Sequence, residues 1–132
     1  MLDASALLEY VLGTDRAEPI RQVIIDSVND LHVPALCDVE FAAGLRQALM
    51  RRSMSRERIR QAADDYLDLP LTHHGHRALL GRILELHGNF SAYDATYVAL
   101  AELLGAWLLT ADRRLTNAVS THTALKTIPP FR

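Results

Sequence analysis

The chain has 132 residues, a formal net charge of −2 at neutral pH and 49% hydrophobic residues. This length fits a single domain, residues 1–132, and the charge excludes a protein that binds nucleic acid through its total charge alone. No apolar run is long enough to span a membrane and no secretory signal precedes the first charged residues, so we expect a cytoplasmic protein. Cys37 is the only cysteine, which excludes an intramolecular disulfide and predicts a small buried apolar residue.

Helical periodicity and capping signals predict a series of helices along the chain. They cover residues 5–12, 18–27, 38–50, 56–68, 77–86 and 92–104. Gly13 and Gly105 follow two of these helices as C-terminal caps, whereas Asp38 and Ser55 stand at positions typical of N-terminal caps. The stripe of apolar residues on the helix at 92–104 is the most regular, and we expect Tyr97 on this helix to lie in the core.

Short apolar runs between the helices predict strands at residues 1–3, 31–33, 69–72, 107–110 and 125–128. Pro70 weakens the third of these, because proline lacks a backbone hydrogen-bond donor. We expect Trp107 in the core rather than stacked on a base. Strands that alternate with helices indicate a parallel sheet covered on both faces. The predicted fold class is therefore α/β, a three-layer α/β/α sandwich with about five strands.

Four acidic residues fall at one edge of this predicted sheet. Asp3 ends the first strand, Glu40 lies in the first turn after the second strand, and Asp112 follows the strand that contains Leu109. Asp94 lies in the first turn of the helix that leads back into that strand, so it also lies over the carboxyl edge. Ligand sites of parallel sheets lie at this edge.

Each acid also has an alternative interpretation as a helix cap or a first-turn carboxylate. The four residues from Ser91 to Asp94 resemble a capping box, and Asp112 would cap the turn that begins at Arg113. Four converging carboxylates, however, repel one another unless a cation neutralises them. Their hard oxygen ligands favour Mg²⁺ or Mn²⁺ over zinc.

Four segments carry a family resemblance that covers almost the whole chain. They are residues 2–8 (LDASALL), 39–40 with 45–46 (VE, LR), 93–95 with 97–101 (YDA, YVALA) and 109–115 (LTADRRL). In order and spacing they resemble the motifs of PIN-domain proteins, with the greatest similarity to the VapC toxins of bacterial VapBC modules. The resemblance implies a five-stranded parallel sheet and a metal-dependent endoribonuclease that leaves a 5′-phosphate and a 3′-hydroxyl.

The resemblance also implies roles for individual residues. Asp3 and Asp94 would contact the Mg²⁺ or Mn²⁺ ion, and Glu40 and Asp112 would complete the acidic cluster as further ligands or catalytic groups. Supporting residues would be Ser5, Thr110 and Asn117. Asn117 stands where the family often has another acid, so occupancy of a second metal site is an open question. The first strand is very short, because Met1 is only two residues before Asp3, and the natural start of the chain would lie either here or further upstream.

An arginine-rich stretch suggests how RNA would be held. Our candidates for RNA contact are Arg46, Arg51, Arg52 and, after the last acid, Arg113. The alternative is that the stretch, which also contains Arg56, Arg58 and Arg60, is a solvated helix face.

The helix at residues 5–12 is apolar almost all round and has a single charge at Glu9. Either a protein partner covers Leu8, Val11 and Leu12, or other helices of this chain do. The resemblance implies a homodimer and a VapB-like antitoxin, with operator DNA bound only through the antitoxin.

Two other functions have some support in the sequence. His73, His74 and His76 resemble a metal cluster, but they lie where a strand meets a loop and lack a defined ligand spacing. A non-catalytic, receiver-like signalling or binding domain would share the parallel sheet, and Lys126 near the last strand is typical of one. The third strand leads into Thr72 and His73 rather than a phosphoacceptor carboxylate, which disfavours that alternative.

Overall fold

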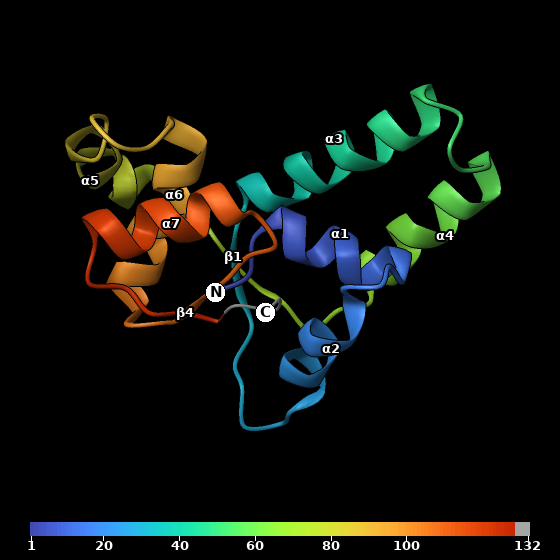
Figure 1. The fold of residues 1–132 in the computed structure, drawn as a ribbon, viewed down its shortest axis with the longest axis horizontal. Helices are drawn as coiled ribbons and strands as arrows, with labels where there is room; N and C mark the ends of the chain where they lie inside the picture. Colours follow the sequence, from blue (N-terminus) through green and yellow to red (C-terminus); the bar gives the residue numbers. More distant parts are fainter. Residues whose placement is uncertain (129–132) are drawn as a thin grey trace.

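The computed structural model describes residues 1–128 as helices that surround a set of short parallel strands (Figure 1). The helices are α1 (Ala4–Leu12), α2 (Ala17–Ile25), α3 (Leu36–Met50), α4 (Arg56–Leu67), the 3₁₀ helix η1 (Arg77–Leu79), α5 (Leu80–Glu85), α6 (Ala92–Leu104) and α7 (Arg113–His122). The strands are β1 (His32–Pro34), β2 (Thr72–His74), β3 (Leu108–Leu109) and β4 (Thr127–Ile128). The predicted order of helices and strands is confirmed as far as β3, but α7, a helix between β3 and β4, was not predicted from the sequence.

Two parallel strand pairs, β1 with β2 and β3 with β4, are joined through the first residues of the chain. Leu2 forms a parallel bridge with Leu109 of β3, and the Leu2 backbone N–H donates to the His32 carbonyl of β1 at 3.1 Å. The order across the sheet is therefore β2, β1, residues 1–3, β3 and β4. The expected first strand is very short, but it lies at the centre of the sheet.

Helices lie on both sides of these strands, as the three-layer prediction requires (Figure 1). Helix α1 packs against α2, α3 and α4, whereas α6 packs against α5 and contacts both β1 and β3. α6 is buried along most of its length, from Ala95 to Ala101, because it crosses the middle of the sheet. No helix among residues 1–128 has both the length and the apolar character needed to cross a membrane.

The α1 helix is covered by helices of the same chain. Val11 is buried, and Leu8 and Leu12 are partly buried against the core. A Cβ added at Gly44 of α3 would approach a methyl group of Leu8, so the two helices are in close contact. The structure thus favours the second of the two explanations for this apolar helix, cover from within the chain.

Four local predictions were wrong. β2 begins at Thr72, two residues after Pro70, because the strand starts only where backbone donors are again available. Asp38 lies inside the first turn of α3 and does not cap it, and Glu40 is one turn deeper than predicted, because the helix begins at Leu36. Trp107 is 53% exposed rather than in the core, whereas Tyr97 and Cys37 are buried as predicted.

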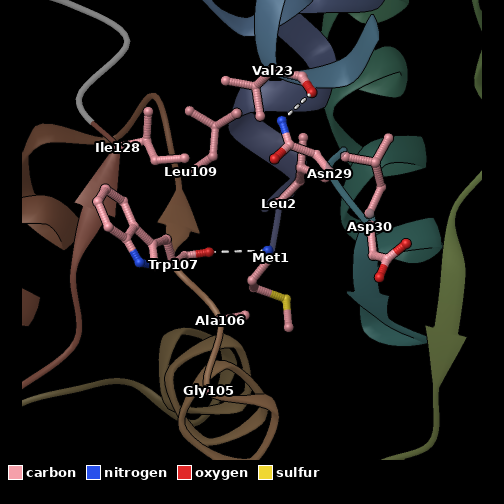
Figure 2. Close-up of a pocket in the computed structure, with 11 residues that line it drawn as sticks. Met1, Leu2, Val23, Asn29, Asp30, Gly105, Ala106, Trp107, Leu109 and Ile128 are labelled. Carbon is pink, nitrogen blue, oxygen red and sulfur yellow. Dashed lines mark hydrogen bonds between the residues drawn. The ribbon is translucent and has the colours of Figure 1, made fainter. Parts of the chain in front are cut away.

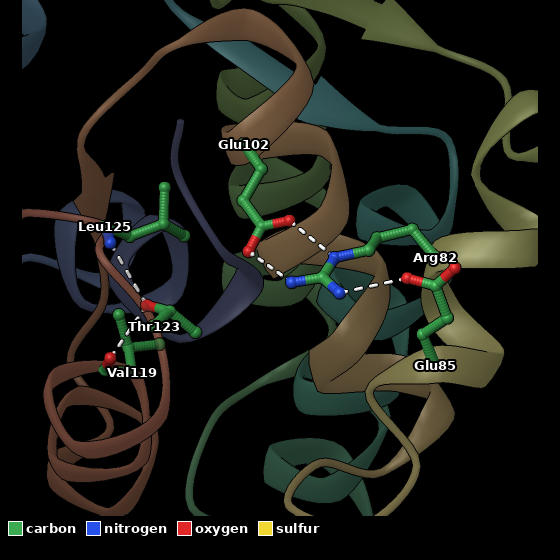
Figure 3. Close-up of polar contacts among 6 residues, drawn as sticks. All are labelled: Arg82, Glu85, Glu102, Val119, Thr123 and Leu125. Carbon is green, nitrogen blue, oxygen red and sulfur yellow. Dashed lines mark hydrogen bonds and ion pairs between the residues drawn. The ribbon is translucent and has the colours of Figure 1, made fainter.

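Polar contacts hold the helices around the sheet in place (Figure 3). Arg82 of α5 donates to both carboxylate oxygens of Glu102 on α6, at 2.7 and 3.1 Å, and also to Glu85 at 3.0 Å. At the end of α7, the Thr123 hydroxyl donates to the Val119 carbonyl and accepts from the Leu125 N–H. These contacts fix the α5–α6 pair and the end of α7, two of the elements that surround the acidic edge.

Candidate active site

Asp3 is the most enclosed of the four acids, with 5% of its surface exposed. It ends the central strand and caps α1, so its carboxylate accepts from the Ala6 N–H at 3.0 Å and from the Ser5 hydroxyl at 2.7 Å. The Thr110 hydroxyl at the end of β3 donates to the second carboxylate oxygen. Ser5 and Thr110 line the acid, as the family resemblance implied.

Burial raises the pKa of Asp3 to about 6. The hydroxyl and amide donors of Thr110, Ala6 and Ser5 oppose this shift, and the negative charge of Asp112 adds to it. An ordinary helix cap accepts hydrogen bonds at the exposed start of a helix. Asp3 differs, because it is buried, accepts from three donors and has a raised pKa. Asp3 is therefore both a cap and a buried charge within electrostatic range of a second acid.

Asp112 links the buried acid to the open part of the site. It caps α7 by accepting from the N–H groups of Arg114 at 2.9 Å and Leu115 at 3.4 Å. The negative charge of Asp112 raises the pKa of Asp3 and, after burial, is the next largest cause of the raised pKa of Asp94. The structure thus brings Asp112 within electrostatic range of both Asp3 and Asp94.

Asp94 lies in the first turn of α6, where its N–H donates to the Ser91 hydroxyl at 3.1 Å. Ser91 is therefore the N-terminal cap, and the Asp94 side chain is within electrostatic range of Asp112. Ser91 and the positive charge of Arg114 oppose the increase in the pKa of Asp94.

Glu40 approaches the site from α3 and has the buried Tyr97 hydroxyl as its neighbour. Burial raises the pKa of Tyr97, and Cys37 and Glu40 raise it further. The Tyr97 hydroxyl makes no hydrogen bond of normal geometry within residues 1–128, although it is enclosed on all sides. Burial also raises the pKa of Cys37 to about 11, and the Asp3 charge contributes to this increase. Cys37 therefore interacts electrostatically with Asp3, and Tyr97 with Glu40.

The chemistry of these donors suits a hard divalent cation, because all of them are oxygens and the charge of Asp112 raises the pKa of both Asp3 and Asp94. Within residues 1–128, no three His, Cys, Asp or Glu side chains gather closely enough to hold a metal ion by themselves. Mg²⁺ commonly takes only one or two protein carboxylates and keeps several waters. The residues therefore fit an ion that keeps several water ligands. They fit a metal whose ligands all come from the protein less well.

A pocket of about 400 Å³ opens beside Asp94 and Asp112. Its lining includes Arg114, which the sequence analysis did not single out, and Asn89 in the loop before α6. Arg113 and Asn117 are exposed on α7 and do not line this pocket. The phase of α7 decides which of two adjacent arginines faces the acids.

The histidine group has other partners. His74 and His32 lie on neighbouring strands with ring nitrogens 2.9 Å apart, and a His73 ring nitrogen lies 2.9 Å from the Asp38 carboxylate. His76 accepts from the Leu36 N–H at 2.9 Å. These contacts fasten β2 to β1 and to the start of α3, the helix that carries Glu40.

A second pocket, of about 450 Å³, lies at the opposite edge of the sheet (Figure 2). The Met1 ammonium donates to the Trp107 carbonyl at 3.0 Å, and Asn29 and Asp30 border the same space. Burial lowers the pKa of this ammonium. None of the four predicted acids lines this pocket.

The sequence matches the PIN-domain family over residues 1–119. It is 39% identical to a VapC ribonuclease of Mycobacterium bovis, Mb0985, and to ribonuclease VapC9 of Mycobacterium tuberculosis, over 98% of each chain. Ribonuclease VapC12 of M. tuberculosis is 32% identical over 89% of this chain and 90% of its own. This chain belongs to the PIN-domain family and, within it, to the VapC ribonucleases.

A solved structure agrees with the fold. PAE2754 from Pyrobaculum aerophilum aligns with a TM-score of 0.59 and 20% identity, and the alignment covers 96% of this chain and 80% of that one. The similarity confirms the α/β architecture in which the acids are placed.

Proposed function

We propose that this protein is a divalent-metal-dependent endoribonuclease that acts as the toxin of a toxin–antitoxin module. The observation that carries the proposal is the electrostatic coupling of Asp3, Asp94 and Asp112 at the carboxyl edge of a PIN fold. Kinship with VapC ribonucleases over 98% of the chain supports RNA as the substrate.

Asp3, Asp94 and Asp112 would hold Mg²⁺ or Mn²⁺, directly or through water. When bound, the ion lowers the pKa of a water molecule and neutralises negative charge on the phosphate. Ser5 and Thr110 keep the Asp3 carboxylate in one orientation through their hydroxyl donors. Glu40 would orient the attacking water or accept its proton, and the neighbouring Tyr97 limits where that carboxylate can move. The products are an RNA 5′-phosphate and a 3′-hydroxyl.

The longer-range RNA contacts remain those proposed from the sequence. Arg46, Arg51 and Arg52 are exposed at the end of α3 and beyond it. At 1.5 Å per residue, Arg51 lies about 16 Å further along the α3 axis than Glu40. These arginines would therefore contact RNA several nucleotides from the reacting phosphate, and Arg113 would contact it nearer the site.

The partners we propose are a VapB-like antitoxin and a second copy of this chain. The names of the relatives support an antitoxin as a partner. Operator DNA would bind to the antitoxin and not to this chain. Because α1 is covered by α2, α3 and α4, the antitoxin would reach the site over the partly buried Leu8 and Leu12 rather than over the buried Val11. We expect the complex in the cytoplasm.

The test is cleavage of structured RNAs by the purified protein with Mg²⁺ or Mn²⁺ and with a chelator. We expect metal-dependent cleavage whose downstream fragments carry a 5′-phosphate, detected as substrates for a 5′-phosphate-dependent exonuclease. Fragments with 5′-hydroxyl ends, or equal cleavage in the chelator, would contradict the proposed chemistry.

No observation supports the receiver-like alternative. Its lysine would have to reach the acidic site, whereas the Lys126 ammonium lies 5.3 Å from the centre of the Trp107 ring. Lys126 and Trp107 precede two parallel strands, so both lie at the amino edge, away from the acids.

A further inference from the structure

The pocket beside Asp94 has walls of different chemical character. Its lining residues come from the loop before α6, from α6 itself and from α7: Asn89, Phe90, Ser91, Asp94, Asp112, Arg114, Leu115 and Ala118. Phe90 and Leu115 are buried and form an apolar floor, and the Phe90 ring is fixed edge-on to His122 at 6.3 Å. The pocket thus combines an apolar base with a rim of two acids, an amide, a hydroxyl and one guanidinium.

Arg114 supplies the positive charge of this pocket. It is exposed, and its charge lowers the pKa of Asp94, so the two side chains are within electrostatic range. Yet within residues 1–128 its guanidinium forms no ion pair of 4 Å or less with any carboxylate. Arg82, by contrast, is held by Glu102 and Glu85. The donors of Arg114 are therefore available to an incoming anion.

We infer that Arg114 binds a phosphate of the RNA backbone in this pocket, next to the phosphate that is cleaved. A guanidinium can donate two parallel hydrogen bonds to a phosphate, which a lysine ammonium cannot do in the same way. The apolar floor accepts the ribose or the base of the nucleotide. The Asn89 amide is exposed at the rim and has both a donor and an acceptor for the polar groups of that nucleotide. The assignment rests on the proposed ribonuclease function and adds a nucleotide subsite to it.

The subsite also resolves a problem of charge. An RNA strand that approaches Asp94 and Asp112 meets two carboxylates that repel its phosphates. A divalent ion offsets this repulsion at the reacting phosphate only. Arg114 offsets it at the neighbouring phosphate.

The test compares Arg114→Gln with Arg21→Gln, which removes the same charge from α2, where Arg21 pairs only with the exposed Glu18. Binding of a fluorescent single-stranded RNA is measured by anisotropy in a chelator, so that no cleavage occurs, over a series of NaCl concentrations. We expect Arg114→Gln to weaken binding roughly tenfold. The slope of log affinity against log salt should become shallower by about 0.7, the value for one lost phosphate contact on a single strand.

A second variant distinguishes the two-point hydrogen bonding of the Arg114 guanidinium from its positive charge. Arg114→Lys should keep the salt slope of the wild type but bind more weakly, because the two-point contact is lost. In cleavage assays with Mn²⁺, Arg114→Gln should raise KM more than it lowers kcat. The Arg21→Gln variant should match the wild type in all three measurements.

Several outcomes would overturn the assignment. A salt slope unchanged in Arg114→Gln, with only the melting temperature altered, would mean that Arg114 merely neutralises Asp94 within the protein. A shallower slope in Arg113→Gln instead would move the phosphate contact to the neighbouring arginine. If the wild type neither binds RNA in the chelator nor cleaves it with Mn²⁺, both this assignment and the proposed function fail, whereas wild-type cleavage with an unchanged slope in Arg114→Gln contradicts the assignment alone.

Discussion

The two edges of the central sheet each bury one charged group of the same three-residue segment. At the amino edge the Met1 ammonium has one hydrogen bond, to the Trp107 carbonyl, and faces a pocket lined mainly by apolar side chains. At the carboxyl edge Asp3 has donors from Ser5, Ala6 and Thr110, and two further acids stand nearby. Burial disfavours the charged form of both groups, since it lowers the pKa of the ammonium and raises that of the carboxylate.

The surroundings of the two buried charges differ, and the difference shows when a buried charge indicates a bound ligand. The Met1 ammonium has His32 as a neighbour that can carry a charge of the same sign, but burial and the charges of His74 and of the ammonium lower the pKa of His32, so that repulsion is relieved when the imidazole loses its proton. Asp3 has a second carboxylate as its neighbour, and the charge of Asp112 adds repulsion to the cost of burial. A folded protein keeps such a cluster of like charges when a bound cation offsets the repulsion. The predictions below compare equivalent changes at the two edges.

The largest effect is expected on catalysis. Asp94→Asn keeps the shape of the side chain but removes its charge, so RNA cleavage with Mn²⁺ should fall at least about a hundredfold. Asp30→Asn makes the same chemical change at the amino edge and should leave the cleavage rate unaltered. The two rates are measured on one structured RNA, with circular dichroism to confirm that both variants are folded. Equal rates for Asp94→Asn and the wild type would remove Asp94 from the active site.

The second effect is on stability in the presence of metal. A divalent ion at about a hundred times its dissociation constant should stabilise the folded wild type by roughly 2.7 kcal/mol. For a domain of this size the melting temperature should rise by roughly 10 °C. Asp3→Asn and Asp94→Asn should each remove most of this rise, and Asp30→Asn should retain it. A rise that persists in both site variants would place the ion elsewhere, with His73 to His76 the first region to test.

The third effect concerns pH in the metal-free protein. The pKa of Asp3 rises from 3.8 to about 6 on folding, so the folded state binds more protons between these values. Protonated Asp3 therefore stabilises the folded state below about pH 4. This contribution to the free energy of unfolding, about 3 kcal/mol, is lost as the pH rises to about 6.

The Asp3→Asn variant has no carboxylate to ionise at this position. In a chelator, the difference in melting temperature between this variant and the wild type should therefore be more in favour of the variant at pH 7.5 than at pH 4.5. Asp30→Asn, at an exposed position, is the matched control and should show no comparable dependence. A difference between Asp3→Asn and the wild type that stays constant over this range would mean that Asp3 is not held with a raised pKa.

The smallest effect is expected at the amino edge itself. Trp107 is the only tryptophan, and its half-exposed ring reports on this edge alone. Saturation with Mg²⁺ should therefore leave its fluorescence emission unchanged, while acrylamide should quench it. A metal-dependent shift that survives in Asp94→Asn would show that the amino edge binds the ion.

The sequence predicted those parts of the site that depend on position along the chain. Asp3, Asp94 and Asp112 follow strand ends or open helices, and the alternation of strands and helices places all such positions at one edge. Both interpretations of these acids proved compatible: Asp3 and Asp112 do cap helices, and they also face each other across the site.

The remainder of the site depends on rotation about helix axes and on tertiary contacts. Arg113 and Arg114 are adjacent, and only the phase of α7 on the sheet turns Arg114 towards Asp94. The contact of Tyr97 with Glu40 joins α6 to α3, two helices without a local sequence signal for their packing. Trp107 has a strand-like neighbourhood, but it precedes β3 and lies at the rim, where no helix covers it.

The position of residues 1–3 has a consequence for how the chain reaches its folded state. Leu2 pairs with Leu109 and lies beside His32, so the centre of the sheet is assembled from segments about a hundred residues apart. On a ribosome, residues 1–3 must wait for β3 to emerge before their hydrogen bonds to Leu109 can form. Long-range pairings of this kind slow folding, because the entropy of closing the loop is lost before the contacts are gained. The last step of folding should therefore be the closure of β3 onto residues 1–3, which also brings Thr110 to Asp3 and completes the acidic site.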